Sequence, residues 1–486
     1  MTNRNSLKPS CECSIDRLLQ HKDIFIFITK AQKQSDSFSG KSYITYHLRI
    51  GDTQTKRRYS EFESFRKALT SLYPALIIPP IPEKHSFVDY ATLQAKIKDD
   101  LPMVEKRKRM LQTFLNRVAK HPELGKDHVF HQFLESTVTW SDVLHSPPLS
   151  TIPKNLLQMV LHRDVQIPTH TLNPVLASNL IPTPSTAYQL KKPDPRFEES
   201  EKFTFRIANY MSNNLDKSQR KVIRRLGELA NDYAELGAVY NGFSLNESGT
   251  VANAIEKIGQ AVDTGYTETG QMVTSLEGEF AEPIQEHAQF AHIIKKTLKF
   301  RHMKHVQVEL IKEELENKKE HLSSLQNMEN EARRLEEALT RNKTIGPNAV
   351  DVDEINNPQE ELIGASRVLS SRSSNSTWSG RSMRVISAVG YTLQNIIDVD
   401  PEATRRNQIG MSKDAIHVLE EALNITNKDL NSVSTELQAD LDRFQREKIH
   451  DMRDMLIAYA KIHIRYCQKN LKSWQEARAE VEKIEI

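Results

Sequence analysis

Helical periodicity fills most of the C-terminal part of the chain and runs for much longer than a globular helix usually does. Three helical stretches follow residue 195, at positions 197–240, 250–341 and 407–482. At ~1.5 Å per residue the second stretch exceeds ~100 Å, even though Pro283 is expected to kink it. Helices of this length bury their apolar faces by packing along one another, so the sequence predicts a bundle.

The third stretch carries the clearest signature of helix packing. Apolar side chains recur at every seventh position, and Leu419 and Val433 fill part of the complementary seam. Acidic residues occupy other seam positions, which favours a bundle over a clean two-stranded coiled coil. The row of seventh positions consists of Ile416, Leu423, Leu430, Leu437 and Phe444.

The N-terminal part of the chain has a different pattern, in which short strands alternate with short helices. Strand-like segments are followed by a helix, a proline segment at 77–82 and further helices. This order predicts a small α+β domain over residues 21–140, after a disordered tail of residues 1–20. The expected strands are 23–30, 43–50 and 55–60, and the expected helices are 61–73, 99–120 and 127–134.

Residues 141–195 form the boundary between the two parts. Nine prolines fall within residues 146–195, which predicts a proline-rich linker. Within it, residues 154–163 form either a short amphipathic helix or an apolar patch that packs on a neighbour. The helical part then covers 196–486, with a polar, serine-rich insertion at 343–404.

Composition limits the function classes. Lys and Arg total 66 against 64 for Asp and Glu, so the net charge of +2 argues against nucleic acid as a partner. No nucleotide-binding glycine loop occurs and the 17 histidines show no metal-ligand spacing, so we expect neither an enzyme nor a cofactor. The three cysteines, Cys11, Cys13 and Cys467, have no nearby partners in the sequence, which predicts free thiols and no metal site.

No apolar stretch approaches the ~18 residues that a membrane-spanning helix needs. The opening residues, MTNRNSLKPS, lack the apolar run of a secretory signal. We therefore expect a cytosolic protein that reaches membranes only by binding to their surface.

The run Arg57-Arg58-Tyr59-Ser60-Glu61-Phe62 has chemistry that suits a phosphate group. A guanidinium can bind two phosphate oxygens, and a helix that begins at this point adds free N–H groups and partial positive charge. Tyr59 offers a flat face against which a sugar-like ring could lie. Taken alone, the run is weak evidence for a phosphate site, because arginines at strand edges are common.

Two further motifs follow in order: the loop Pro79-Pro80-Ile81-Pro82 with Lys84 after it, and the helix sequence RKRMLQTFL at 107–115. With these, residues 20–140 resemble the PX (phox-homology) domain. The resemblance implies a site for phosphatidylinositol 3-phosphate, in which Arg107 rather than Arg109 is favoured by its spacing to the following apolar residues. The implied roles are Arg58 and Ser60 on the 3-phosphate, Tyr59 under the inositol ring, Lys84 on the 1-phosphate and Arg107 on the ring hydroxyls.

The segment after the proline loop and the long helices both offer further candidate membrane contacts. Phe87, Val88 and Tyr90 either enter the bilayer interface or pack the loop. A basic cluster on the second long stretch either faces anionic headgroups or is a solvated helix face. This cluster comprises Lys295, Lys296, Lys299, Arg301 and Lys304, and the first stretch adds Lys221, Arg224 and Arg225.

The C-terminal residues Arg443, Phe444, Glu447, Lys448 and Trp474 resemble the last helix of a BAR domain in sorting nexins. The expected fold is therefore an α+β PX domain followed by an all-α BAR domain of three long helices. The whole chain resembles a PX-BAR sorting nexin, most closely the fungal autophagy-linked subfamily, on the runs at 79–118 and 129–144 and on the long insertion.

That resemblance implies endosome-to-Golgi retrieval and selective autophagy, on endosomal and pre-autophagosomal membranes. It also implies a heterodimer with a sorting-nexin-four-type partner, and a homodimer stays open. Within the insertion, an apolar stripe that includes Trp378, Val385, Ile386 and Val389 either inserts into the membrane or folds back on the bundle. The alternative function is a coiled-coil scaffold whose PX fold does not depend on lipid.

Overall fold

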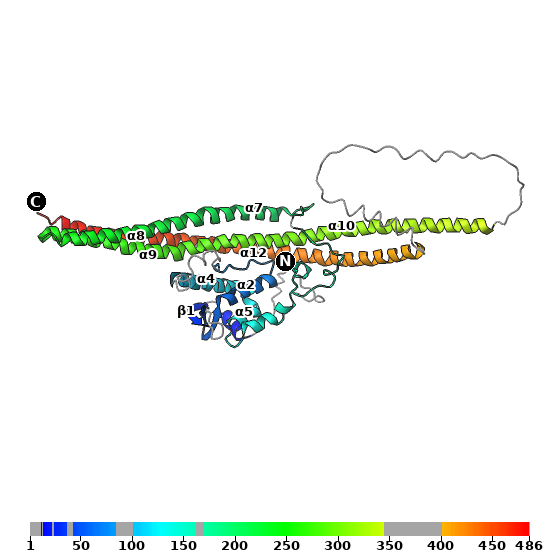
Figure 1. Ribbon diagram of the computed structural model, residues 1–486, viewed down its shortest axis with the longest axis horizontal. Helices are drawn as coiled ribbons and strands as arrows, with labels where there is room; N and C mark the ends of the chain where they lie inside the picture. The colour runs from blue at the N-terminus through cyan, green and yellow to red at the C-terminus, as the bar shows by residue number, and fades with distance from the viewer. Residues whose placement is uncertain are drawn as a thin grey trace, which may run out of the picture. The chain divides into compact units, whose positions relative to one another are not determined.

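The computed structural model describes residues 11, 13–21, 24–35, 42–83, 101–161, 170–185, 187–344 and 401–485 (Figure 1). These residues divide into two compact units. The first combines Met1–Glu309 with Asn424–Ile486, and the second is Leu310–Leu423. Among the described residues, no helix is both long enough and apolar enough to cross a membrane.

The small domain contains a three-stranded antiparallel sheet in the order β1-β2-β3. Strands β1 (Phe27–Ser35), β2 (Ser42–Ile50) and β3 (Thr53–Arg58) follow each other along the chain, and Gly51 takes a positive φ in the tight turn between β2 and β3. Side chains alternate along β3, where Thr55 and Arg57 are buried while Lys56 and Arg58 are exposed. This alternation separates structural from solvent-facing residues in the candidate phosphate-binding motif.

Helices cover the sheet and complete an aromatic core. They are α2 (Tyr59–Leu72), α4 (Leu101–Lys120), η2 (Leu124–Lys126), α5 (His128–Leu134) and α6 (Trp140–His145). Phe65 of α2 stacks on Phe133 of α5 with ring centroids 4.4 Å apart, and Trp140 meets both rings edge-on. The predicted order of strands and helices is therefore present.

The boundary of the predicted N-terminal tail was wrong. Residues Ser14–Leu19 form a short helix, α1, and Ile15 is fully buried in the aromatic core. Leu18 and Leu19 of α1 also pack against this core, so several apolar side chains bring the segment into the domain.

The predicted linker also packs on its neighbours in part. It contains the 3₁₀ turns η3 (Leu149–Thr151) and η4 (Leu156–Gln158), and Met159 pairs with Leu172 in an isolated bridge. Met159 and Val160 are fully buried. Of the two interpretations left open for residues 154–163, packing on a neighbour is the one observed in the described part, which ends at Leu161.

The long helices of the C-terminal part are α7 (Pro195–Asn209), α8 (Asp216–Ser244), α9 (Gly249–Leu276), α10 (Glu282–Thr344) and α12 (Pro401–Val481). Asp194 caps α7 and Pro195 occupies its first turn, where no N–H is needed. The π turn η5 (Tyr210–Leu215) joins α7 to α8, and the π turn η6 (Glu277–Ala281) joins α9 to α10 just before Pro283. The helical path thus continues past the proline, as expected.

Apolar clusters hold these helices together within the first unit. Ile223 of α8, Met272 and Leu276 of α9, and Ile462 of α12 form one cluster, and Figure 1 shows the three helices side by side. Phe290 and Ile294 of α10 pack with Leu437 and Phe444 of α12 in another. Leu437 and Phe444, two members of the predicted row of seventh positions, therefore pack against another helix of the same chain. In the second unit, Lys319 of α10 and Glu420 of α12 form an ion pair of 2.6 Å.

Candidate phosphoinositide-binding site

The two adjacent arginines of the motif have different surroundings. Arg57 is buried, and its guanidinium donates hydrogen bonds to backbone carbonyls after and within α5, including Phe133 at 2.9 Å and Glu135 at 3.0 Å. Arg58 points to the exposed face, where its guanidinium carbon lies 3.7 Å from the ring centre of Tyr43 and Nη2 donates to the Tyr43 hydroxyl at 2.9 Å. Only Arg58 is therefore accessible to a ligand.

The start of α2 places further donors beside Arg58. The backbone N–H of Arg58 donates to the Glu61 carboxylate at 2.6 Å, which fixes the turn from strand to helix. Ser60 is exposed in the first turn of α2, where N–H groups lack partners within the helix. Arg58 and Ser60 are thus together at a helix N-terminus.

Arg107 of α4 approaches the same place from another element. Its guanidinium carbon lies 5.3 Å from the ring centre of Tyr59, whose hydroxyl donates to the carbonyl of Pro82 in the proline loop. Burial raises the pKa of Tyr59 to about 12, so its hydroxyl stays protonated at neutral pH. Strand β3, helix α2, the proline loop and α4 therefore meet around Tyr59.

Arg109 faces away from this place, because its guanidinium binds the Glu282 carboxylate of α10 at 2.6 and 3.1 Å. The structure thus brings together Arg58, Tyr59, Ser60 and Arg107 of the predicted set. Lys84 and the candidate insertion residues Phe87, Val88 and Tyr90 lie outside the described residues. The stripe with Trp378, Val385, Ile386 and Val389 does so as well.

The basic cluster on α10 divides into exposed and buried members. Lys295, Lys296 and Lys299 are exposed. Lys304 has only 1% of its surface exposed, and its ammonium group bonds to Asp429 at 2.6 Å and to the carbonyl of Met159 at 2.9 Å. The prediction that Lys304 faces headgroups is wrong, because the folded part of the linker covers it.

The prediction that Arg301 faces headgroups is also wrong, because the start of α7 covers this side chain. Its guanidinium carbon lies 4.1 Å from the ring centre of Phe197 and Nη2 lies 3.5 Å from Asp194, and both partners belong to the start of α7. Arg301 is 6% exposed. Its role is to anchor α7 on α10.

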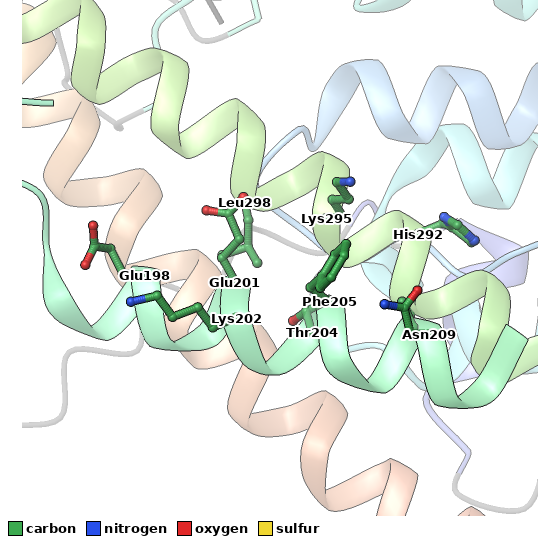
Figure 2. Close-up of a pocket in the computed structure, with 11 residues that line it drawn as sticks. Glu198, Glu201, Lys202, Thr204, Phe205, Asn209, His292, Lys295 and Leu298 are labelled. Carbon is green, nitrogen blue, oxygen red and sulfur yellow. The ribbon is translucent and has the colours of Figure 1, made fainter. Parts of the chain in front are cut away.

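A groove between α7 and α10 surrounds the first of the exposed lysines (Figure 2). Lys295 lies 5.8 Å from the ring centre of Phe205, and the groove has a volume of about 440 Å³. Glu198 and Glu201 of α7 line it as well. Lys295 therefore has acidic neighbours, whereas Lys296 does not line this groove.

A feature that the sequence analysis missed is a row of exposed apolar side chains along α8. They recur at every seventh residue, as in a coiled-coil seam without a partner. A shorter row with the same spacing lies on the C-terminal half of α12. The first row is Val222, Leu229, Leu236 and Phe243 of α8, preceded at the same spacing by Leu215 at the end of η5, and the second is Ile457, Ile464 and Leu471. The spacing was readable from the sequence.

Comparison with known proteins agrees with this architecture. The PX domain family matches residues 49–137. The three long helical paths that follow, α7 with α8, α9 with α10, and α12, have the fold of a BAR domain. The cryo-EM structure of the SNX-BAR Mvp1 tetramer aligns with a TM-score of 0.52 over 94% of this chain and 99% of that chain, at 14% identity. The fold is thus that of the PX-BAR class.

Relatives of higher identity give the family. Sorting nexin-41 of Cryptococcus neoformans is 42% identical over 97% of this chain and 74% of its own length, and sorting nexin-41 of Emericella nidulans is 36% identical over 99% and 88%. Autophagy-related protein 20 of Gibberella zeae is 35% identical over 96% and 86%. The chain belongs to the sorting nexins.

Proposed function

We propose that the protein binds phosphatidylinositol 3-phosphate through Arg58, Tyr59, Ser60, Lys84 and Arg107. The observation that carries this proposal is the meeting of Arg58 and Arg107 around Tyr59 at the start of α2. An exposed arginine beside free helix N–H groups suits a phosphate dianion. Tyr59 offers an aromatic face beside Arg107, which suits the inositol ring.

The arrangement also supports a preference among lipids. Arg107 approaches the ring of Tyr59 from α4, whereas Arg58 ends β3 immediately before Tyr59. An inositol ring on Tyr59 would direct its 3-phosphate to Arg58 and its neighbouring hydroxyls to Arg107. Further phosphates at those hydroxyls would compete for the space that Arg107 occupies.

The protein acts in this proposal as a dimer on endosomal and pre-autophagosomal membranes. The unpartnered rows on α8 and α12 support association with another helical pair, either in a second sorting nexin or in a second copy. Lys296 and Lys299 supply exposed positive charge for anionic headgroups. The names of the relatives support roles in sorting and autophagy, and endosome-to-Golgi retrieval is the sorting step that we propose.

The test is sedimentation of the full chain with liposomes that differ only in their phosphoinositide. Arg58→Ala is compared with Lys56→Ala, because Lys56 is exposed on the same face of β3 two residues away. We expect selective binding to phosphatidylinositol 3-phosphate that Arg58→Ala reduces at least ~10-fold and Lys56→Ala leaves nearly unchanged. Equal binding to all lipids, or no effect of Arg58→Ala, would favour the lipid-independent scaffold.

A further inference from the structure

Two cysteines and two histidines that are far apart in the sequence meet beside the aromatic core. Cys11 and Cys13 precede α1, whereas His128 and His131 lie one turn apart on α5. One potential ligand atom of each residue lies within 4.8 Å of the others. Sequence proximity did not indicate this contact, because the histidines lie more than a hundred residues from the cysteines in the sequence.

The distances fit a small tetrahedral ion. The Cys11 and Cys13 sulfurs are 3.2 Å apart, and His131 Nδ1 lies 3.0 Å from the first and 3.4 Å from the second. Zinc with bonds of ~2.3 Å to sulfur and ~2.0 Å to nitrogen would set these separations at roughly 3.5–3.8 Å. The separations would have to lengthen by up to about 0.6 Å to reach those values.

Neighbouring groups already orient two of the ligands. His131 Nε2 donates to the carbonyl of Gly125 at 2.8 Å, which leaves Nδ1 with its lone pair directed at the sulfurs. A backbone carbonyl in this position is the usual outer partner of a metal-bound histidine. The backbone N–H of Asp16 donates to Cys13 Sγ at 3.3 Å, as suits a thiolate.

The position of Gly125 makes that carbonyl hard to replace. A Cβ atom at this residue would lie 2.4 Å from the carbonyl oxygen of Ala119, so a larger residue would displace the turn.

We propose that Cys11, Cys13, His128 and His131 bind one zinc ion that fastens the N-terminal segment to α5. A set of four protein ligands leaves no open position, so the role is structural. Because α5 and the residues after it supply the carbonyls that hold Arg57, the ion would brace the side of the domain behind Arg58. The proposal does not depend on which lipid, if any, Arg58 binds.

The test uses the full chain purified without chelators and measures its zinc content by inductively coupled plasma mass spectrometry. The variants are Cys11→Ser and His128→Gln, both at exposed positions, with Cys467→Ser as the matched control because Cys467 is an exposed, free thiol on α12. We expect about one zinc per wild-type chain, unchanged in Cys467→Ser and reduced at least ~5-fold in each ligand variant.

A second measurement keeps the proposal testable if zinc is lost during purification. Cobalt(II) added to the metal-free protein should produce the visible absorption of a tetrahedral thiolate site in wild type and Cys467→Ser only. Melting temperature with and without a chelator should differ for wild type and not for Cys11→Ser. Absence of bound zinc together with no cobalt spectrum, or zinc that survives in both ligand variants, would overturn the assignment.

Discussion

Arg117 of α4 donates hydrogen bonds to both carboxylate oxygens of Glu286 of α10, at 2.6 and 2.8 Å. Its Nη2 also donates to Asp451 of α12 at 2.8 Å. Burial by itself would lower the pKa of Arg117, but the two carboxylates raise it overall. One side chain of the PX domain is thus bound to two helices of the BAR domain.

Removing this arginine should weaken the contact between the domains. Arg117→Ala leaves Glu286 buried and without its cation, which should lower the free energy of unfolding by about 3 kcal/mol. Urea denaturation measures the loss, and limited proteolysis should release the PX domain more readily. The control is Lys108→Ala on the same helix, whose partly exposed pair with Glu105 should contribute less than about 1 kcal/mol. Similar losses in both variants would contradict the expectation.

Substitutions of the two arginines of the candidate phosphate-binding motif should separate an effect on stability from an effect on binding. Arg57→Ala removes the donors for the carbonyls of Phe133 and Glu135, so we expect a loss of about 3 kcal/mol. Arg58→Ala changes an exposed residue and should alter stability by less than about 0.5 kcal/mol. Thermal unfolding distinguishes them, and a large loss in Arg58→Ala would mean that its effect on lipid binding is indirect.

Substitution of Lys304 should change stability, whereas substitution of Lys296 should change binding to membranes. Lys304→Met leaves the Asp429 carboxylate buried without its cation and should cost about 3 kcal/mol. Lys296→Met should leave stability unchanged but weaken binding to anionic liposomes, more strongly at low salt. Unfolding curves and liposome sedimentation at two salt concentrations measure both effects. Stability unchanged in Lys304→Met would contradict the structure.

The row of apolar residues on α8 should control association. Leu229→Glu places a charge in the middle of the row. The dissociation constant of the complex with a second chain should therefore rise at least ~10-fold. Light scattering of the chain alone and mixed with a sorting-nexin-four-type partner gives the mass of the complex. Asn231→Glu, also exposed on α8 but outside the row, is the control. Equal masses for wild type and Leu229→Glu would exclude the row from the interface.

Stability should fall as pH falls below neutrality because of His287. Burial lowers its pKa from 6.5 to about 4, an effect that Asp451 opposes and that Arg117 and Lys448 reinforce. The unfolded chain therefore binds a proton on this residue between pH 6.5 and 4 while the folded chain does not, so stability is lost across that window and no further below it. Protonation of His287 should thus lower the free energy of unfolding by about 3 kcal/mol across this window.

Urea unfolding at several pH values between 7.5 and 4.5 measures this dependence. In His287→Gln the stability curve should be flatter by the same amount, because the substituted side chain does not titrate. A variant that follows the wild-type curve would assign the pH dependence to other groups.

The sequence predicted the elements whose signals are local. Three strands followed by a helix were predicted from alternation and spacing along short segments, although β1 lies at Phe27–Ser35 and not at 23–30, and α2 begins at Tyr59, two residues before the predicted start. Burial of Lys304 could not be predicted this way, since its partners Asp429 and Met159 lie over a hundred residues from it in the sequence. The meeting of Cys11 with His131 was hidden for the same reason. Long-range contacts decide burial, and burial decides what a charged or metal-binding side chain can do.

Asp440 of α12 accepts hydrogen bonds from the backbone N–H of Ile77 at 2.7 Å and from His121 at 3.0 Å. These bonds add to those of Arg117, so the PX domain is docked in more than one place. Its rotational freedom is consequently lost during folding and not at the moment of membrane encounter. A lipid that binds at Arg58 therefore orients the BAR domain as well. A lipid-binding domain on a flexible linker would instead lose rotational entropy when it binds the membrane.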